Sequence, residues 1–331
     1  MRCATALLVL CCGLPCRGAE PKKPSTPGKS QPDAPAQVTL PRIYKYPRSV
    51  ENWLDVQIAL ARQAISCGSI DGVGGYQSAA GLRAFQERAG LDPTGRLDTA
   101  TRERLVLNSH IYQQISLSAE DLAGLQPLSK TWLGKAEQTA LACETALELA
   151  AERTHAHPKL LKQLNPDLDW ARITPNTKIV VPAIEREVPL PRPANLHISL
   201  SDKTLQARDE AGNILAHCPV SIAKRAEKRP EGELHVTVVV PNPDYTFDPE
   251  VFPESAEARE IGRKLMIPPG PNNPVGVAWI GLDLPGYGIH GTPNPEQVGR
   301  TESHGCFRLA NWDAQMLLGM AYVGLPVIVD P

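Results

Sequence analysis

The chain has 331 residues, of which 42% are hydrophobic and 21% are charged, and its formal net charge is −2. This length is enough for two or three domains with real apolar cores. The near-neutral charge and the lack of a basic patch argue against nucleic acid as a partner. No apolar run is long enough to cross a bilayer, so we expect no transmembrane segment.

The N-terminus has the pattern of an export signal. One positive charge, Arg2, precedes a short apolar run that ends near Cys12, and small residues follow. We expect residues 1–18 to be a signal peptide cleaved after Gly18, which places the protein in the periplasm or cell envelope. A lipoprotein cut at Cys16 is the alternative. Residues 19–48 are rich in Pro, Lys and Ser, which predicts a disordered linker.

Residues 49–108 have a helical pattern. Apolar residues recur at helical spacing in three short stretches, which contain Val56, Leu82 and Leu97. Glycines separate the stretches and indicate turns. The pattern therefore predicts a small three-helix domain.

Residues 109–185 are less regular. A helix can begin at Thr145, a second helix is favoured near Lys159, and residues 178–182 are typical of a strand. We therefore expect a small α/β segment.

The C-terminal part begins after a second linker at residues 186–194, which contains three prolines. Residues 195–331 alternate between apolar and polar residues, as strands do. The expected strands are 196–200, 204–208, 214–222, 234–240, 275–280 and 327–329. Between the last two of these strands, after Cys306, we expect a helix that is capped by Asn311 and runs through Met320, with Leu317 and Met320 packing inward. The chain as a whole is predicted to be a multidomain α+β protein.

A cluster of reactive side chains lies near the C-terminus. Cys306 follows His304 by two positions and His290 by sixteen. A thiol attacks as its thiolate, so a useful cysteine needs a base or a positive charge beside it, and either imidazole supplies that. Gly305 permits a tight turn that brings backbone N–H groups to a substrate carbonyl, and Arg308 can bind a carboxylate. The pattern predicts a cysteine nucleophile.

Two other readings of this cluster stay open on the pattern alone. Cys306 could be an inert core thiol. It could also be a zinc ligand, although the cluster offers one cysteine, and paired ligands at zinc spacing are lacking.

Residues 195–331 resemble the catalytic domain of the YkuD-type L,D-transpeptidases, which crosslink bacterial peptidoglycan. The resemblance is carried by the stretches Pro268–Gly276, Trp279–Leu282, Tyr287–Thr292 and Ser303–Leu309. It implies a mixed β-sandwich. It also implies that Cys306 is the nucleophile, that His290 is the base, and that the Gly291 carbonyl orients the imidazole.

The resemblance implies further site residues. His304 belongs to the catalytic group and is the alternative base. Substrate-binding roles fall to Tyr287, Thr292, Ser303, Gly305 and Arg308. The implied chemistry needs no metal and no cofactor.

Two N-terminal resemblances point to the same partner. Residues 49–108 resemble the three-helix peptidoglycan-binding domain, with a generic helical spacer as the alternative. Residues 109–185 are similar to the last two-thirds of a LysM module, which binds glycan. We therefore expect peptidoglycan as the partner of a monomeric enzyme.

The implied reaction is acyl transfer. Cys306 attacks the L,D-amide of a tetrapeptide stem, forms a thioester and passes the acyl group to an amine of a second stem. The alternatives are an L,D-carboxypeptidase, an enzyme that tethers protein to peptidoglycan, and a non-catalytic peptidoglycan-binding protein. Of the other cysteines, Cys218 is expected to be buried in a strand, and a Cys67–Cys143 bridge is a further alternative.

Overall fold

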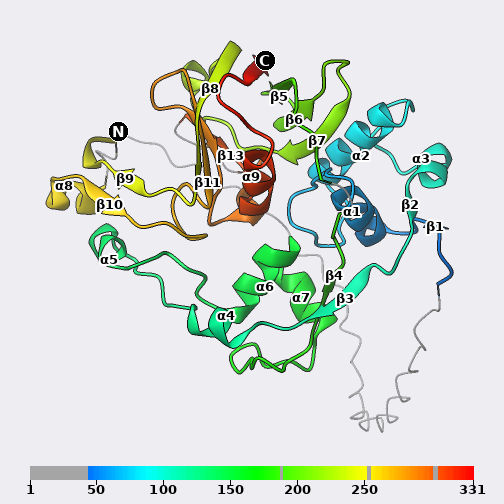
Figure 1. Ribbon diagram of the computed structural model, residues 1–331, viewed down its shortest axis with the longest axis horizontal. Coiled ribbons are helices and arrows are strands. Elements are labelled where there is room, and N and C mark those ends of the chain that lie inside the picture. The colour runs from blue at the N-terminus through cyan, green and yellow to red at the C-terminus, as the bar shows by residue number, and fades with distance from the viewer. Residues whose placement is uncertain (1–43, 187–188, 252–254, 301–304) are drawn as a thin grey trace, which may run out of the picture. The chain divides into compact units, whose positions relative to one another are not determined.

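The computed structural model describes residues 44–186, 189–251, 255–300 and 305–331. Residues 44–331 form one compact unit (Figure 1). The predicted signal peptide and residues 19–43 of the predicted linker lie outside the described residues.

The first part of the unit is the expected three-helix domain. Its helices are α1 (Trp53–Ala61), α2 (Tyr76–Arg88) and α3 (Thr99–Arg104), and β1 (Arg48–Ser49) pairs with β2 (Val106–Leu107). Side chains define two helix starts, since Asn52 accepts from the Asp55 N–H and Asp98 from the Thr101 N–H. The apolar faces meet in one core that includes Val56, Ile58, Leu60, Leu82, Phe85 and Leu105.

A buried glutamine fixes the loop between α2 and α3. Gln86 is fully buried, and its side chain accepts from the Gly95 N–H at 2.8 Å and donates to the Thr101 hydroxyl at 2.7 Å. Gly95 has a φ of 68°, which favours glycine. The glycine-rich loop in the sequence is thus a defined turn around one amide.

The middle segment follows the order strand, helices, strand. Its elements are β3 (Tyr112–Ile115), α4 (Ala119–Ala123), α5 (Trp132–Ala136), α6 (Ala146–Thr154), α7 (Pro158–Leu164) and β4 (Ile179–Pro182). β3 and β4 pair antiparallel, and α6 and α7 pack with them around Leu117, Ala150, Leu161, Ile179 and Val181. The two helices and the closing strand match the expectation, whereas β3 was not expected.

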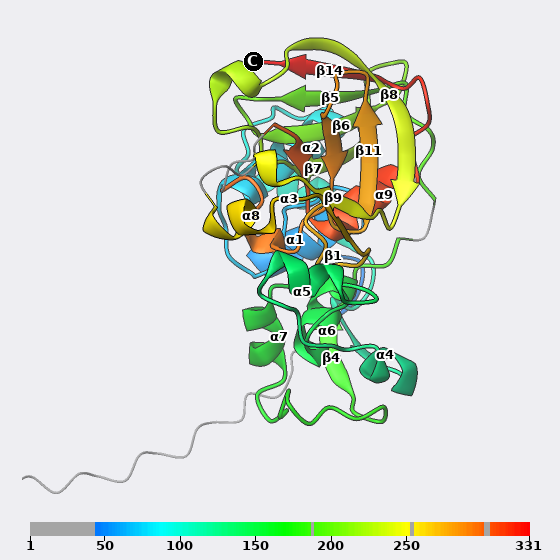
Figure 2. The same ribbon diagram turned by 90° about the vertical axis from the view of Figure 1, so that its left-hand side faces the viewer.

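The C-terminal part is a curled mixed sheet. Among the described residues it has eight strands in the order β13-β12-β11-β8-β14-β5-β6-β7. Figure 2 labels six of them, β11, β8, β14, β5, β6 and β7. Their bounds are β5 (Asn195–Ser199), β6 (Thr204–Arg208), β7 (Ile214–Pro219), β8 (Gly232–Pro241), β11 (Ala278–Leu282), β12 (Gly288–His290), β13 (Phe307–Arg308) and β14 (Pro326–Asp330). The β12–β13 and β14–β5 pairs are parallel and the others are antiparallel. The sheet is mixed, as expected.

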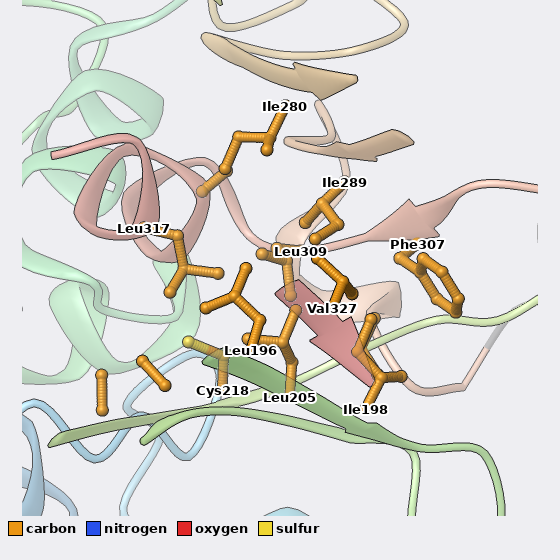
Figure 3. Close-up of a cluster of buried hydrophobic side chains, with 14 of the residues drawn as sticks. Leu196, Ile198, Leu205, Cys218, Ile280, Ile289, Phe307, Leu309, Leu317 and Val327 are labelled. Atoms are coloured by element: carbon orange, nitrogen blue, oxygen red, sulfur yellow. The ribbon is translucent and has the colours of Figure 1, made fainter. Parts of the chain in front are cut away.

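The sheet curls because β8 belongs to both of its halves. This long strand pairs with β11 through its second half and with β14 through its first half. Side chains from both halves and from α9 (Asn311–Leu318) therefore meet in one core. Figure 3 shows Leu196 and Leu205 from one half, Ile280 and Ile289 from the other, and Leu317 from the helix.

A small hairpin stands outside the main sheet. β9 (Tyr245–Phe247) pairs antiparallel with β10 (Leu265–Ile267), and α8 (Ala256–Ile261) lies between them in the chain. The 3-10 turns are η1 (Ala226–Lys228), η2 (Pro249–Val251) and η3 (Pro295–Gln297). The hairpin shares a core with the middle segment, formed by Leu141, Phe247, Ala258, Leu265 and Ile267.

The start of α9 differs from the prediction. Asn311 was expected as the N-cap, but Ala310 takes that position without a side-chain hydrogen bond. Asn311 is the first helical residue and uses its amide in tertiary contacts. Leu317 and Met320 are buried, as predicted.

The three-helix domain is bonded to the edge of the main sheet. Residues next to α1 extend along β7, since the Ser66 N–H donates to the His217 carbonyl at 2.8 Å and the His217 N–H donates to the Ala64 carbonyl at 2.9 Å. The Ser66 hydroxyl also donates to the Asp313 carboxylate at 2.9 Å. The domain is therefore fixed to the sheet by backbone pairing as well as by side chains.

A carboxyl group at the junction of α6 and α9 gives a stability prediction. Burial raises the pKa of Glu152 from 4.5 to about 8, against the opposing effect of the Asn311 hydrogen bond. The folded state therefore binds this proton more tightly than the unfolded state, and the stability it gives is lost as pH rises from 4.5 through 8. We expect the melting temperature of Glu152→Gln to equal that of wild type at pH 4.5. At pH 8.5 it should be about 2–4 °C higher than that of wild type. Melting curves at the two pH values check this, with exposed Glu51→Gln as the control.

Candidate active site

The site is built on the parallel pair β12 and β13. Ile289 pairs with Phe307 and His290 pairs with Arg308. Ile289 and Phe307 point into the core, where they are 0% and 1% exposed. Because side chains alternate along a strand, His290 and Arg308 lie on the other face, and Cys306 precedes Arg308 by two positions.

These side chains open into one cavity of about 760 Å³. Cys306, His290, Arg308, Tyr287 and Gly305 all line it. Its remaining wall is mostly apolar and includes Trp132, Val240, Pro243, Tyr245, Val251, Pro274, Val275 and Trp279. The structure thus brings the predicted thiol and the first predicted imidazole to the same solvent-accessible space.

A backbone carbonyl sets the orientation of His290. The ring Nδ1 lies 2.6 Å from the Gly291 carbonyl oxygen. A carbonyl can only accept, so Nδ1 carries the hydrogen and Nε2 is left with a lone pair that can take a proton. The ring also stacks on Trp279, with 5.7 Å between the ring centroids. Both contacts hold the imidazole as a base.

Burial determines the protonation of the pair. It lowers the pKa of His290 to about 4, a shift that the Gly291 hydrogen bond opposes and the Arg308 charge supports. Burial also raises the pKa of the Cys306 thiol, against a backbone hydrogen bond at Gly288 and the Arg308 charge. At neutral pH the two groups are therefore a neutral imidazole and a thiol. This favours proton transfer during attack over a preformed ion pair.

Tyr287 supports the loop that carries the sulfur. A side chain on Gly305 would approach the Tyr287 ring, because an ideal Cβ there lies 3.4 Å from the nearest ring atom. The Tyr287 hydroxyl donates to the Lys228 carbonyl at 3.1 Å. The Cys306 Sγ lies 3.4 Å from the Gly286 carbonyl oxygen. Residues 286–287 thus pack directly under the nucleophile.

The remaining predicted site residues are placed differently. Thr292 is 5% exposed and lines a smaller hollow with Ser221 and Arg308, apart from the Cys306 cavity. Arg308 contributes to both spaces, and its backbone exchanges hydrogen bonds with Ser221 at 2.9 and 3.0 Å. Ser303 and His304 lie outside the described residues, so their roles stay predictions.

Asn311 supports the active site, whereas the sequence predicts it only as a helix N-cap. Its Oδ1 lies so close to Gly291 that a Cβ there would be 2.3 Å away. Its amide also donates to the Pro271 carbonyl at 3.1 Å and to the Glu152 carboxyl at 3.3 Å. Asn311 therefore braces the residue whose carbonyl orients His290.

Because Asn311 braces Gly291, we predict that removing its side-chain amide lowers the activity while Cys306 stays reactive. We expect Asn311→Ala to lower kcat about 10- to 100-fold, because a small shift of Gly291 misdirects the imidazole. Alkylation of Cys306 by iodoacetamide at pH 9 should stay near the wild-type rate. Exposed Asn294 supplies the control variant Asn294→Ala. An unchanged kcat would contradict the role.

The other cysteines are buried away from this chemistry. Cys67, Cys143 and Cys218 are buried, and none of the four described cysteines is bonded to another of them. The alternative Cys67–Cys143 bridge is therefore not formed, while Cys218 lies buried in β7 as expected. Among the described residues, no group of three or more His, Cys, Asp or Glu side chains could hold a metal ion.

Family models match two parts of the chain. Residues 193–329 match the family described as "L,D-transpeptidase catalytic domain", and residues 49–105 match the one described as "Putative peptidoglycan binding domain".

Two curated proteins and one solved structure are similar to parts of this chain. "Putative L,D-transpeptidase YkuD" of Bacillus licheniformis is 27% identical over 188 residues, which are 57% of this chain and 94% of that protein. "Putative L,D-transpeptidase YqjB" of Bacillus subtilis is 37% identical over 116 residues, which are 33% of this chain and 56% of that protein. A solved L,D-transpeptidase from Xylanimonas cellulosilytica is 14% identical, with a TM-score of 0.35 over 89% of this chain and 100% of that one.

Proposed function

We propose that Cys306 carries the acyl group of a peptidoglycan stem as a thioester and transfers it to an amine, since residues 193–329 match the family of L,D-transpeptidase catalytic domains. The observation that carries the proposal is the shared cavity of Cys306 and His290, in which the Gly291 carbonyl leaves the His290 Nε2 able to accept a proton.

The first half of the reaction forms the thioester. His290 Nε2 takes the thiol proton as Sγ attacks the carbonyl carbon between the third stem residue and the terminal D-residue. Backbone N–H groups around Gly305 stabilise the oxyanion, with Ser303 and His304 as further predicted contributors. The C–N bond then breaks, and the imidazolium returns its proton to the leaving amine.

The second half releases the product. The side-chain amine of another stem attacks the thioester carbon and loses its proton to His290. The C–S bond breaks, and the imidazolium protonates the departing thiolate. The net result is an exchange of one amide for another, so no oxidant, metal or cofactor is consumed. The Arg308 guanidinium is suited to hold a stem carboxylate in the cavity.

The N-terminal parts would hold the enzyme on its substrate. The match of residues 49–105 supports peptidoglycan docking by the three-helix domain. The packing of α6 and α7 with the strand pair β3 and β4 supports the proposed likeness of residues 109–185 to a LysM module, with α4 and α5 inserted between β3 and α6. Export by the signal at residues 1–18, with residues 19–48 as a tether, would bring the enzyme to the wall. In the part of the chain that the structure describes, no helix is long and apolar enough to cross a membrane.

One assay tests the proposal. Mature protein is incubated with disaccharide-tetrapeptide, and the products are read by mass spectrometry. Crosslinked dimers are expected. Tripeptide monomers alone would indicate a carboxypeptidase, and a stem joined to an added lysine-bearing protein would indicate a tethering enzyme. Unchanged substrate would mean a binding protein. A parallel reaction with a chelator should give the same product yield, and a lower yield would favour the alternative that Cys306 is a zinc ligand.

A further inference from the structure

We propose that Trp132, which the middle segment contributes, is a substrate-positioning residue of the Cys306 site. It would form the part of the cavity wall against which the donor stem peptide lies. The inference deepens the proposed function and rests on it, since it names a residue outside the catalytic domain that helps to bind the substrate.

The first step of the argument is position. Trp132 precedes the family match by about sixty residues of chain, yet it lines the same cavity as Cys306 and His290. Its ring stacks on Phe247 with 4.4 Å between the centroids and an angle of 20°. It also lies 6.2 Å from the ring of Tyr245, which lines the cavity itself. Trp132 is thus joined to the hairpin β9–β10 at the edge of the active site.

The second step is rigidity, because a positioning residue must itself be held. The segment that carries α5 is bonded to the loop after β10: the Leu141 N–H donates to the Pro269 carbonyl at 2.8 Å, and the Asn272 N–H donates to the Leu141 carbonyl at 3.0 Å. A Cβ on Gly270 would lie 2.2 Å from the Leu141 oxygen, so the two backbones are in close contact. The backbone N–H of Trp132 donates to the Glu257 carboxylate at 2.5 Å. The ring therefore has little freedom to leave the wall.

The third step is chemistry. Trp132 and Trp279 are the largest side chains on the apolar side of the cavity. Lys228 and Arg308 supply positive charge elsewhere in the lining. A stem peptide carries both carboxylates and short apolar groups, and it can satisfy both sides at once. The donor occupies the cavity in both half-reactions, first as the bound tetrapeptide and then as the thioester on Cys306. We therefore expect a rigid residue of the cavity wall to affect the binding of the donor stem more than that of the acceptor.

The test compares Trp132→Ala with wild type in the full chain. We expect the KM for disaccharide-tetrapeptide to rise about 10-fold, because the lost indole leaves part of the stem unsupported. The dissociation constant of the tetrapeptide for the Cys306→Ala protein should weaken by a similar factor when Trp132→Ala is added. Iodoacetamide alkylation of Cys306 should stay within the range of the control. The melting temperature is expected to fall, because the indole also packs on the core around Phe247, so all variants are compared at a temperature well below their melting points. Trp132→Phe, which keeps an aromatic ring against Phe247, should restore most of the binding.

Leu133→Ala is the matched control, since Leu133 follows in the same helix and is 44% exposed. An unchanged KM and binding constant in Trp132→Ala would overturn the inference. So would a fall in crosslinking with no change in tetrapeptide consumption, because that would assign Trp132 to the acceptor. A wild-type protein that binds tetrapeptide through Trp132 but makes no product would refute the proposed function and leave the inference standing.

Discussion

Cys306→Ala is expected to form neither dimers nor tripeptides from disaccharide-tetrapeptide, with a rate at least about 10⁴-fold below wild type. The alanine keeps the backbone that leads into β13 but removes the only atom that can hold the acyl group in the proposed mechanism. Intact-protein mass spectrometry should show a tripeptide adduct on wild type and none on the variant. The cavity and the melting temperature should be nearly unchanged, because Cys306 is at the surface of the cavity and not in the core.

Cys67→Ala is the control for this variant, since Cys67 is a buried thiol of the three-helix domain whose pKa burial raises to about 12. Such a thiol is not ionised at neutral pH and cannot serve as nucleophile. Product formation by Cys306→Ala at the wild-type rate would refute the proposed acyl-transfer mechanism.

His290→Ala is expected to lower kcat/KM about 10²- to 10⁴-fold at pH 7, the usual loss when a general base is removed. In wild type, kcat/KM should fall as pH drops through about 4, because the imidazole then becomes protonated and can no longer take the thiol proton. In the variant that acid limb should disappear. Its residual activity should instead rise about tenfold per pH unit until the thiol ionises, because attack then depends on free thiolate.

A pH series of kcat/KM on wild type, His290→Ala and His304→Ala separates the two imidazoles. His110→Ala, at an exposed position, is the control. If His304→Ala loses the acid limb and His290→Ala keeps it, the base is His304.

The local part of the site was predictable from the sequence. The stretches around His290 and Cys306 lie close together in the chain, and glycine and proline positions restrict the backbone between them. Strands with clear alternation, such as β5 and β6, were also found close to their observed bounds. Where short-range pattern and tertiary structure agree, sequence reasoning is sufficient.

The parts that were missed depend on distant contacts. β9 and β10 have three residues each, too few for a periodicity to appear. Asn311 has the residue type of a helix cap, but burial against Gly291 and Pro271 gives its amide better partners. Trp132 has no local signal at all, since its place in the active site depends on Phe247 and on the backbone contact at Gly270.

The pairing of residues 64–66 along β7 has a consequence for any shortened form of the enzyme. β7 ends the order of the main sheet, and an open edge of this kind is a template for other chains. Besides its proposed role in docking to peptidoglycan, the three-helix domain therefore covers part of an exposed sheet edge. A version trimmed to its catalytic portion would uncover that edge and tend to self-associate, even with every reactive group intact.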